Sequence, residues 1–468
     1  MKQQETNKRI VKLLAAVSII ALECGVYWII WNRYYNRIIE FPFWRKGNWL
    51  MVALYGILLI FFNQMYGGLK VGFLRRGNLI YSQMLSVTFV NIITYLQIAL
   101  LDKKFHHFGY VFGMELADAV VIVLWCLLFQ KIYESLFPPR RMMLVYGERP
   151  AFHLMEKINS RDDKYILEGA MHISNGVQRI LKEAQKYDAV ILGDVPADQR
   201  NEIVKVCYRM NIRTYIVPKI SDIIIRSAVE LNIFDSPLYL SRNVGLSIEQ
   251  EILKRAADLV LSAIALVITS PFFLIIAVLI KLTDGGPVFY KQKRLTKDRK
   301  VFDIYKFRTM IPNAEKDCGA RLAAEHDPRI TPVGKFLRAC RMDELPQLIN
   351  ILKGEMSIVG PRPERPELAE EIEKDMPEFS YRLKVKAGLT GYAQFYGKYN
   401  TTPYDKLKLD LTYIRNYSVF LDLKLMLLTP KILLLKESTE GVTAEDNTTE
   451  SGQMTAAEGM AKEQGRGR

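Results

Sequence analysis

Long apolar segments alternate with polar stretches in the first part of the chain. Four such segments span residues 10–31, 49–66, 79–101 and 110–129. Each has roughly the ~20 residues that an α-helix needs to cross a bilayer. Aromatic side chains stand near several of the ends, as they do at membrane interfaces: Trp28, Trp31, Trp49 and Tyr66. The pattern predicts a region of four transmembrane helices over residues 1–139.

Charged residues in and beside these segments add orientation and candidate sites. Lys8 precedes the first segment, Arg76 lies in the second loop, and Arg141 follows the fourth segment. Because cytoplasmic loops are rich in Lys and Arg, both ends of the region are expected in the cytoplasm. The first loop is also basic and departs from this rule. Acids inside apolar segments are functional candidates, with contacts inside a helix bundle as the open alternative: Glu23, Glu115 and Asp118.

Strand and helix patterns alternate over residues 140–245. The runs RMMLVYG, DAVILGDV and IRTYIVP are typical of buried strands, and VQRILKEAQKY and NEIVKVCYRM between them are typical of helices. This order favours a parallel sheet in a Rossmann-like α/β domain. A dinucleotide site needs glycines after the first strand, but the chain reads Gly147-Glu148-Arg149-Pro150 there. We therefore expect the nucleotide site of this domain to be degenerate or absent.

A fifth apolar segment runs from Lys254 to Lys281 and contains Ser270 and Pro271. Proline removes one helix hydrogen bond and disturbs the preceding turn. The segment is either a fifth spanning helix or a re-entrant helix, residues 254–281, that breaks at Ser270-Pro271 and returns to the side it came from. Eight basic residues follow between residues 291 and 308, and such residues belong on the cytoplasmic side. Together with the orientation above, this favours the re-entrant helix.

Composition narrows the choice of partners. The chain has 468 residues, half of them hydrophobic, and a formal net charge of +14 at pH 7. This charge suits nucleic acid, an anionic membrane face or a phosphorylated substrate. Five scattered cysteines without CxxC spacing argue against a disulfide framework and a zinc site. The remaining regions are a basic, mixed α/β domain over residues 246–436 and a polar tail, residues 437–468, that we expect to be disordered.

Two adjacent acids stand near the start of the stretch MDELPQLINILKGEMSIVGPRP. Pro346 fits the first turn of a helix that continues to Gly354, which places Asp343 and Glu344 at its N-terminal end. Acids often stand there only because the helix dipole favours them. The alternative is a catalytic carboxylate beside one that holds Mg²⁺. Cations of the kind that bind phosphate favour this second interpretation: Lys306, Arg308, Arg338 and Arg362.

These motifs resemble the bacterial sugar transferase superfamily, the monotopic phosphoglycosyl transferases that act on polyprenol phosphate. The resemblance covers roughly residues 249–435. It rests on KFRTM, DPRITPVGKFLRACRMDELPQL, KGEMSIVGPRP, KVKAGLTGYAQFYGKYN and LDLTYIRNYSVFLDLKLMLLT, in the family's order. The apolar segment with Ser270-Pro271 is similar to the family's re-entrant helix. With its N-terminal regions, the chain looks like the large multi-domain subgroup, the exopolysaccharide biosynthesis polyprenyl glycosylphosphotransferases.

The resemblance implies an enzyme that transfers a sugar 1-phosphate from a UDP-sugar to undecaprenyl phosphate and releases UMP, with Mg²⁺ as cofactor. Asp343 would be the nucleophile that forms an aspartyl-phosphosugar intermediate, and Glu344 would bind the metal. Pro361 and Pro363 would shape the Pro-Arg-Pro motif. The family's phosphate and substrate contacts fall on Lys306, Arg308, Arg338 and Arg362.

The same resemblance implies an α/β membrane protein, multi-pass in the bacterial inner membrane, with a cytoplasmic catalytic domain that initiates exopolysaccharide or capsule synthesis. Its partners would be a UDP-sugar, undecaprenyl phosphate, membrane lipid and, through self-association, a second copy, but no nucleic acid. Ala387 stands where the family commonly has proline, and Lys398 where it has arginine, which leaves the transferred sugar open.

Two other functions are weighed against this one. The first is a non-catalytic scaffold for polysaccharide assembly, against which the intact Asp343-Glu344 pair and Arg362 argue. The second is a sugar-nucleotide dehydratase or epimerase that uses the α/β domain. The missing glycine fingerprint argues against it, and TYIRNYS lacks the Tyr-x-x-x-Lys spacing of such enzymes.

Overall fold

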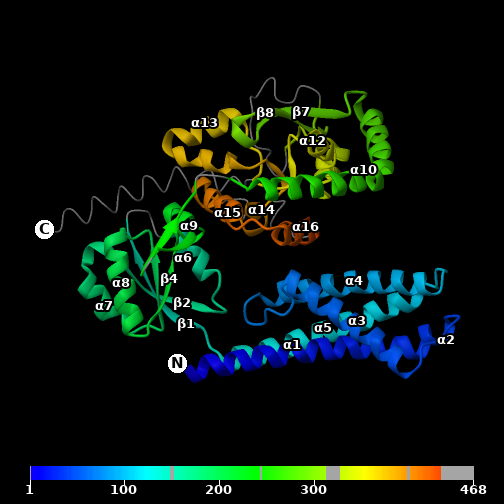
Figure 1. Cartoon of the computed structure of the whole chain (residues 1–468), viewed down its shortest axis with the longest axis horizontal. Coiled ribbons are helices and arrows are strands. Elements are labelled where there is room, and N and C mark those ends of the chain that lie inside the picture. The colour runs from blue at the N-terminus through cyan, green and yellow to red at the C-terminus, as the bar shows by residue number, and fades with distance from the viewer. Residues whose placement is uncertain are drawn as a thin grey trace. The chain divides into compact units, whose positions relative to one another are not determined.

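The computed structural model describes residues 2–147, 152–233, 235–242, 245–311, 327–397 and 401–433. Two compact units make up the chain, Met1–Lys219 and Ile220–Arg468 (Figure 1). The coarse prediction, a mixed α/β protein with long apolar helices near its N-terminus, is confirmed. The tail that was predicted to be disordered and Lys398 lie outside the described residues.

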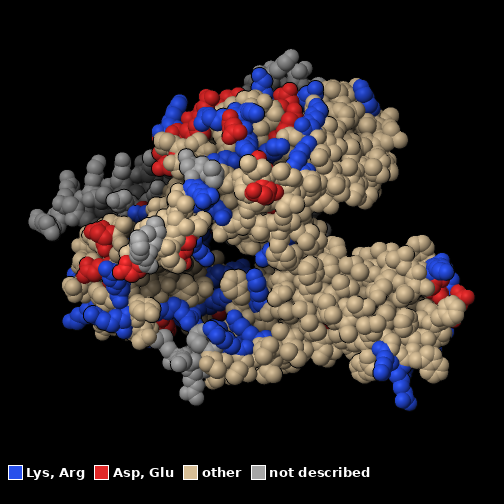
Figure 2. All heavy atoms as spheres, in the orientation of Figure 1, with Lys and Arg blue, Asp and Glu red and all other residues tan. Residues whose placement is uncertain are grey.

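Long apolar helices form the start of the first unit. They are α1 (Lys2–Ile30), α3 (Arg45–Tyr66), α4 (Arg76–Leu101) and α5 (Gly109–Leu136); a π-helical turn η1 (Trp31–Tyr35) and the short α2 (Asn36–Ile38) follow α1. Four stretches are long and apolar enough to cross a membrane: Thr6–Ile38, Arg45–Tyr66, Arg76–Leu101 and Gly109–Leu136. Figure 2 shows their visible surface almost free of charged side chains except near the ends. The predicted apolar segments are therefore helices of the expected length.

Polar side chains meet inside this helix bundle. The Tyr55 hydroxyl donates to Asn91 Oδ1 at 2.8 Å. Asn91 Nδ2 in turn donates to Glu115 Oε2 at 2.7 Å and to Asp118 Oδ2 at 3.2 Å. Glu23 is fully buried. Glu115 and Asp118 thus make the contacts within the bundle that the sequence left as the alternative to a functional role.

A four-stranded parallel sheet completes the first unit, in the order β2-β1-β3-β4. Its elements are β1 (Arg140–Tyr146), α6 (Phe152–Asn159), β2 (Tyr165–His172), η2 (Ile173–Asn175), α7 (Val177–Ala184), β3 (Ala189–Gly193), α8 (Ala197–Arg209) and β4 (Arg213–Ile216). Met143 and Val145 of β1 pack with α7 and α8, whereas Met142 and Leu144 pack with α6. Helices thus cover both faces of a parallel sheet, as the alternation predicts; its Rossmann-like nature stays a prediction.

Strand β2 and Gly147 are two features of this sheet that the sequence analysis did not explain. Strand β2 was not predicted, because its side chains alternate between half-buried and exposed at the sheet edge and give no apolar run. Gly147 follows β1 where the chain comes close to β3. A Cβ atom there would lie 2.3 Å from the carbonyl oxygen of Asp194, so close packing of the main chain accounts for this glycine.

The second unit holds short sheets among helices. It begins with α9 (Ile220–Arg226), the hairpin β5 (Val229–Ile233) and β6 (Ser236–Leu240), α10 (Ile248–Asp284) and the antiparallel pair β7 (Phe289–Leu295) and β8 (Val301–Phe307), with η3 (Lys297–Arg299) between them. It continues with α11 (Pro332–Ala339), η4 (Met342–Glu344), α12 (Gln347–Lys353), β9 (Ser357–Val359), α13 (Pro366–Asp375), η5 (Pro377–Lys384), β10 (Gly388–Thr390), α14 (Tyr392–Tyr396), α15 (Pro403–Arg415) and α16 (Val419–Leu433).

Helix α10 differs from the expectation of a break. It is one helix of 37 residues with Pro271 inside it, so the helix does not end at Ser270-Pro271. Figure 1 shows its two halves running in different directions. Pro271 has no amide to offer the carbonyl of Val267, and Ser270 Oγ donates to that oxygen instead, at 2.8 Å. Because the serine supplies this bond, the helix bends and continues past the proline.

Both halves of α10 pack against the same domain. Ala265 in the first half packs with Ile351 of α12. Ile276 in the second half packs with Phe307 of β8. A straight helix of this length would extend about 55 Å, so only a bent one can return to the domain it left. Much of its remaining surface is exposed and apolar; Leu274, for example, is 71% exposed.

Candidate active site

The two adjacent acids lie on the short 3₁₀ turn η4, which connects α11 to α12. Arg341 precedes the turn with a φ of 52°, a left-handed conformation that residues other than glycine rarely adopt. Helix α12 begins after Pro346 and ends at the left-handed Gly354. The helix predicted from Pro346 to Gly354 is confirmed, and Asp343 and Glu344 stand immediately before it.

Helix α10 supports this turn from both of its halves. Met342 and Leu345, on either side of the acids, pack with the apolar residues of the second half of α10. In the first half, Arg255 donates to the carbonyl oxygens of Ile351 at 2.6 Å and Leu352 at 2.8 Å, at the C-terminal end of α12. The position of the acid pair therefore depends on the bent helix.

Glu344 is held by two cations. Lys306 Nζ lies 2.9 Å from Glu344 Oε1, and Arg362 Nη2 lies 3.2 Å from the same oxygen. Burial disfavours the charge on Glu344, whose side chain is 12% exposed. The two cations outweigh burial and hold the pKa of Glu344 well below its usual range. Glu344 is therefore ionised at neutral pH.

Asp343 has different surroundings although it is the neighbouring residue. It is buried, and in the described part of the chain no hydrogen bond or ion pair joins its carboxylate to another side chain. Burial raises the pKa of Asp343, while the charge of Lys306 opposes the rise. A carboxylate that is desolvated and not occupied by a partner is suited to attack an electrophile.

A pocket that is open to solvent lies beside Glu344. Its lining combines three basic side chains, one acid, one amide and four apolar or small residues: Arg294, Ile304, Lys306, Glu344, Gln347, Arg362, Pro363, Gly388 and Leu389. The excess of positive charge suits an anionic group such as a phosphate. Of the cations predicted from the sequence, Lys306 and Arg362 are thus brought together with the acid pair.

The other two predicted cations have different partners. Arg308 forms an ion pair with Asp284 at the end of α10, and among the described residues no hydrogen bond or ion pair joins it to the acid pair. A buried guanidinium needs a carboxylate, which Asp284 supplies, and the substrate contact of Arg308 stays a prediction. Arg338 Nε donates to Thr309 Oγ1 at 2.8 Å. Arg338 therefore affects Asp343 through its charge, which opposes the rise in that pKa.

The structural residues of the motifs fall in two places. Ser270 and Pro271 lie in the bend of α10. Pro361 and Pro363 flank Arg362 in the loop after β9, and their carbonyl oxygens accept hydrogen bonds from Gly388 N at 2.9 Å and from Arg294 Nη1 at 3.2 Å respectively. The Pro-Arg-Pro loop is therefore anchored through its main chain, which leaves the Arg362 side chain to reach Glu344.

Arg294 is a cavity residue that the sequence reasoning missed. In β7 the exposed Lys291 and Lys293 alternate with the half-buried Gln292 and Arg294. The period-2 alternation of a strand was the available signal, because it separates Arg294 from the surface lysines. Gln347, also in the lining, had no signal beyond its place at the start of a helix.

The residues around the acid pair can hold Mg²⁺ only together with a bound phosphate. Among the described residues, no group of three or more His, Cys, Asp or Glu side chains is placed to hold a metal ion. Mg²⁺ in proteins is often held by one or two carboxylates together with substrate phosphates and water. Asp343 and Glu344 provide such carboxylates beside a cavity of positive charge. The residues therefore fit a Mg²⁺ ion shared with a bound phosphate, and not a separate protein cage.

Comparison with known proteins identifies the family of the region that holds this site. The family model described as bacterial sugar transferase matches residues 249–436, which contain the acid pair, both contacting cations and all of α10 except its first residue. The exopolysaccharide production protein ExoY of Rhizobium meliloti (strain 1021) is 36% identical over 200 residues, which are 40% of this chain and 87% of ExoY. The chain belongs to the bacterial sugar transferase family.

Two further relatives carry names that describe a reaction. The UDP-N-acetylgalactosamine-undecaprenyl-phosphate N-acetylgalactosaminephosphotransferase of Aeromonas hydrophila is 35% identical over 54% of this chain and 60% of its own length. The UDP-glucose:undecaprenyl-phosphate glucose-1-phosphate transferase of Escherichia coli (strain K12) is 42% identical over 41% of this chain and 42% of its own length. The matches thus span about half the length of these relatives.

Proposed function

We propose that this protein transfers a sugar 1-phosphate from a UDP-sugar to undecaprenyl phosphate, as the names of its relatives describe for them. The observation that carries the proposal is the meeting of Asp343 and Glu344 with Lys306 and Arg362 beside a positively charged cavity. The product, an undecaprenyl-diphosphate sugar, would begin the assembly of an exopolysaccharide, a capsule or another glycoconjugate.

The first half of the reaction uses Asp343 as nucleophile. A carboxylate oxygen of Asp343 attacks the sugar-bearing β-phosphorus, and the bond from that phosphorus to the bridging oxygen breaks. UMP leaves with the bridging oxygen and its electron pair, and the sugar phosphate stays on Asp343 as an acyl phosphate. No proton transfer is needed, because the nucleophile and the leaving phosphate are both anions. Lys306 and Arg362 stabilise the negative charge that gathers on the phosphate oxygens.

The second half regenerates Asp343. A phosphate oxygen of undecaprenyl phosphate attacks the same phosphorus, the bond from phosphorus to the Asp343 oxygen breaks, and the carboxylate is released. Glu344 would hold Mg²⁺, which would neutralise charge on the diphosphate when bound. Glu344 keeps its negative charge throughout, since the same two cations hold its pKa low.

Substrate access supports the same proposal. The acid pair is packed against α10, whose exposed side chains are largely apolar. If α10 enters and leaves an inner membrane on the cytoplasmic side, the polyprenyl chain can stay in the lipid while its phosphate meets Asp343. The four N-terminal stretches would cross the same membrane. UDP-sugars are made in the cytoplasm, so both substrates would reach one site.

The test of the reaction is UMP release by detergent-solubilised protein with undecaprenyl phosphate and Mg²⁺. UDP-glucose, UDP-galactose and UDP-N-acetylgalactosamine form the panel, because relatives act on these sugars by name. Release of UMP with one sugar and formation of a lipid-linked sugar phosphate are expected. If no sugar gives product under conditions in which a relative is active, the proposal is wrong and a scaffold role takes its place.

The membrane arrangement has its own test. Cysteines at Ile248 and Leu282, which are 75% and 78% exposed at the two ends of α10, are introduced one at a time into a chain without other cysteines. A membrane-impermeant maleimide is then applied to intact and to permeabilised cells. A re-entrant helix predicts labelling of both positions only after permeabilisation. Labelling of one position from outside would show that α10 spans the membrane.

A further inference from the structure

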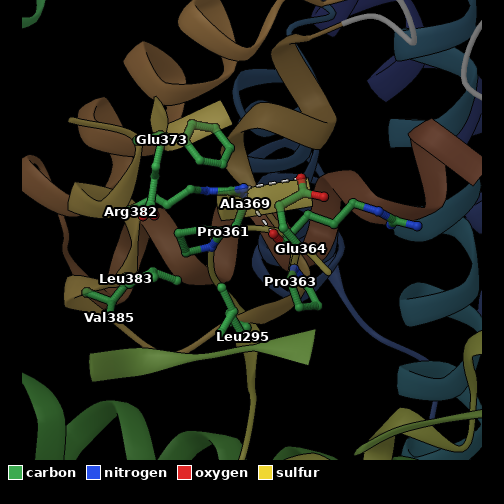
Figure 3. Close-up of a pocket in the computed structure, with 12 residues that line it drawn as sticks. Leu295, Pro361, Pro363, Glu364, Ala369, Glu373, Arg382, Leu383 and Val385 are labelled. Carbon is green, nitrogen blue, oxygen red and sulfur yellow. Dashed lines mark hydrogen bonds and ion pairs between the residues drawn. The ribbon is translucent and has the colours of Figure 1, made fainter. Parts of the chain in front are cut away.

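A buried arginine holds the main chain of the Pro-Arg-Pro loop. Arg382 is 3% exposed, and its Nη2 donates to the carbonyl oxygen of Arg362 at 2.8 Å. The same guanidinium group lies 2.8 Å from Asp410 Oδ2 and 3.2 Å from Glu364 Oε1. Phe379 covers it, with 4.9 Å from the guanidinium carbon to the ring centroid. Figure 3 shows Arg382 extending toward Glu364 beside a pocket that is open to solvent.

Four charged side chains, which we call the arginine cluster, surround this contact: Glu364, Arg382, Lys406 and Asp410. Two acids balance two bases. Burial disfavours the charge on Glu364, but Lys406 and Arg382 outweigh it and lower its pKa to about 2. Burial raises the pKa of Asp410, and Arg382 opposes the rise. Buried ion pairs add little net stability over apolar packing, so stability alone does not account for this cluster.

The geometry of the loop indicates what the cluster does. Prolines have no N–H, so the loop is attached through carbonyl oxygens, and each of its three consecutive carbonyls accepts a hydrogen bond. The two outer bonds come from Gly388 and Arg294. The central one, to the carbonyl of Arg362 itself, comes from Arg382. The side chain of Arg362 extends from this fixed main chain, and its Nη2 lies 3.2 Å from Glu344 Oε1.

We propose that Arg382, held by the arginine cluster, is a positioning residue for Arg362. The inference rests on the proposed transferase function and adds residues of η5 and α15 to it. Arg382 does not line the pocket beside Glu344; it fixes the main chain from which Arg362 meets Glu344 and the phosphates of the substrate. A displacement of 1 Å at such a group is enough to lower a rate by about a hundredfold.

A double-mutant cycle tests this role. Arg382→Lys keeps the charge but loses the guanidinium fork, in which Nη1 faces Glu364 while Nη2 contacts Asp410 and the Arg362 carbonyl. In the otherwise native chain it should lower kcat by on the order of tenfold to a hundredfold. In the Arg362→Ala background the same substitution should change kcat by less than about threefold, since the carbonyl remains but the side chain that it positions is gone. If the two losses multiply, Arg382 does not act through Arg362 and the proposal is overturned.

Controls keep the result readable. Arg299→Lys disturbs another arginine–carboxylate pair of the same domain, Arg299 with Glu373 at 2.7 Å, and should leave kcat unchanged in both backgrounds. Thermal melting checks that each variant folds. If Arg382→Lys is unfolded, Asp410→Asn takes its place in the cycle, because it weakens the ion pair that holds the Arg382 guanidinium in place. An inactive native protein would overturn the transferase proposal itself, whereas an active one with multiplying losses overturns only the positioning role.

Discussion

The parallel α/β region at residues 140–219 and the transferase region at residues 245–433 differ in the regularity of their secondary structure and in the number of charged side chains buried in their interiors. The first has a regular sheet with apolar cores on both faces. The second has small sheets, a turn that follows a left-handed Arg341, and ion pairs between buried side chains. The more regular region contains none of the proposed catalytic residues, and the irregular one carries the candidate chemistry. Regular secondary structure supplies a scaffold, whereas reactive groups need irregular main chain to bring them together.

Loss of the nucleophile has the largest expected effect. Asp343→Asn should lower UMP release by at least ~10³-fold, because the amide cannot form the acyl phosphate. Asp303→Asn, at an exposed position of β8, is the matched control and should keep full activity. An Asp343→Asn protein within tenfold of the native rate would move the chemistry away from the acid pair and break the comparison.

Removal of a cation from Glu344 should have a smaller effect that depends on pH. Lys306→Ala should lower kcat/KM by about ten- to a hundredfold. The charge of Lys306 lowers the pKa values of both Glu344 and Asp343, so both rise when it is gone and the acid limb of the pH–rate profile should move to higher pH. Lys293→Ala, on the neighbouring strand and exposed, should leave the profile unchanged. An acid limb that stays in place would show that Lys306 does not hold the acid pair ionised.

Glu364→Gln should reduce stability. The substitution removes the carboxylate that pairs with Lys406 and leaves Asp410 as the one acid beside two buried bases, so the melting temperature at pH 7 should fall by on the order of 10 °C. The folded-state pKa of Glu364, about 2, lies below its ordinary value of 4.5, so the carboxylate stabilises the fold above pH 4.5. The difference between native and variant should shrink as pH falls from 4.5 toward 2. A constant difference would assign the loss to packing.

The α/β region should give the smallest effect. Lys219 lies 3.5 Å from Asp194 at the end of the parallel sheet where nucleotides bind in related architectures. If the region is only a scaffold, Lys219→Ala should change the KM for the UDP-sugar by less than about twofold. A tenfold rise in KM with unchanged melting temperature would place part of the substrate site in this region and remove the contrast with the transferase region.

Local patterns allowed much of this structure to be predicted. The membrane-length helices follow from the length of their apolar segments, and the helix after Pro346 follows from its proline at the start and its glycine at the end. These signals lie in neighbouring residues and can be read from the sequence. Strand β2 escaped because an edge strand shows no apolar run. The Arg308–Asp284 pair escaped for another reason: nothing near Arg308 in the sequence indicates which distant carboxylate it will meet.

The arginine cluster shows the same limit more clearly. Glu364, Arg382 and Asp410 look like surface charges in the sequence, since such residues are usually exposed. Their burial depends on η5 and α15 folding over the Pro-Arg-Pro loop, which only tertiary structure reveals. Motif residues in direct contact with Glu344 were found from the sequence, and the residues that position them were not.

The central claim is that Asp343 becomes covalently linked to the sugar phosphate. The most direct measurement is mass spectrometry of the protein after incubation with the preferred UDP-sugar and Mg²⁺ but without undecaprenyl phosphate. We predict one UMP released per active site and a hexose-phosphate adduct on the peptide that contains Asp343, removed when undecaprenyl phosphate is added. UMP release that begins only when undecaprenyl phosphate is present, with no adduct, would contradict the account and indicate direct transfer between the two substrates.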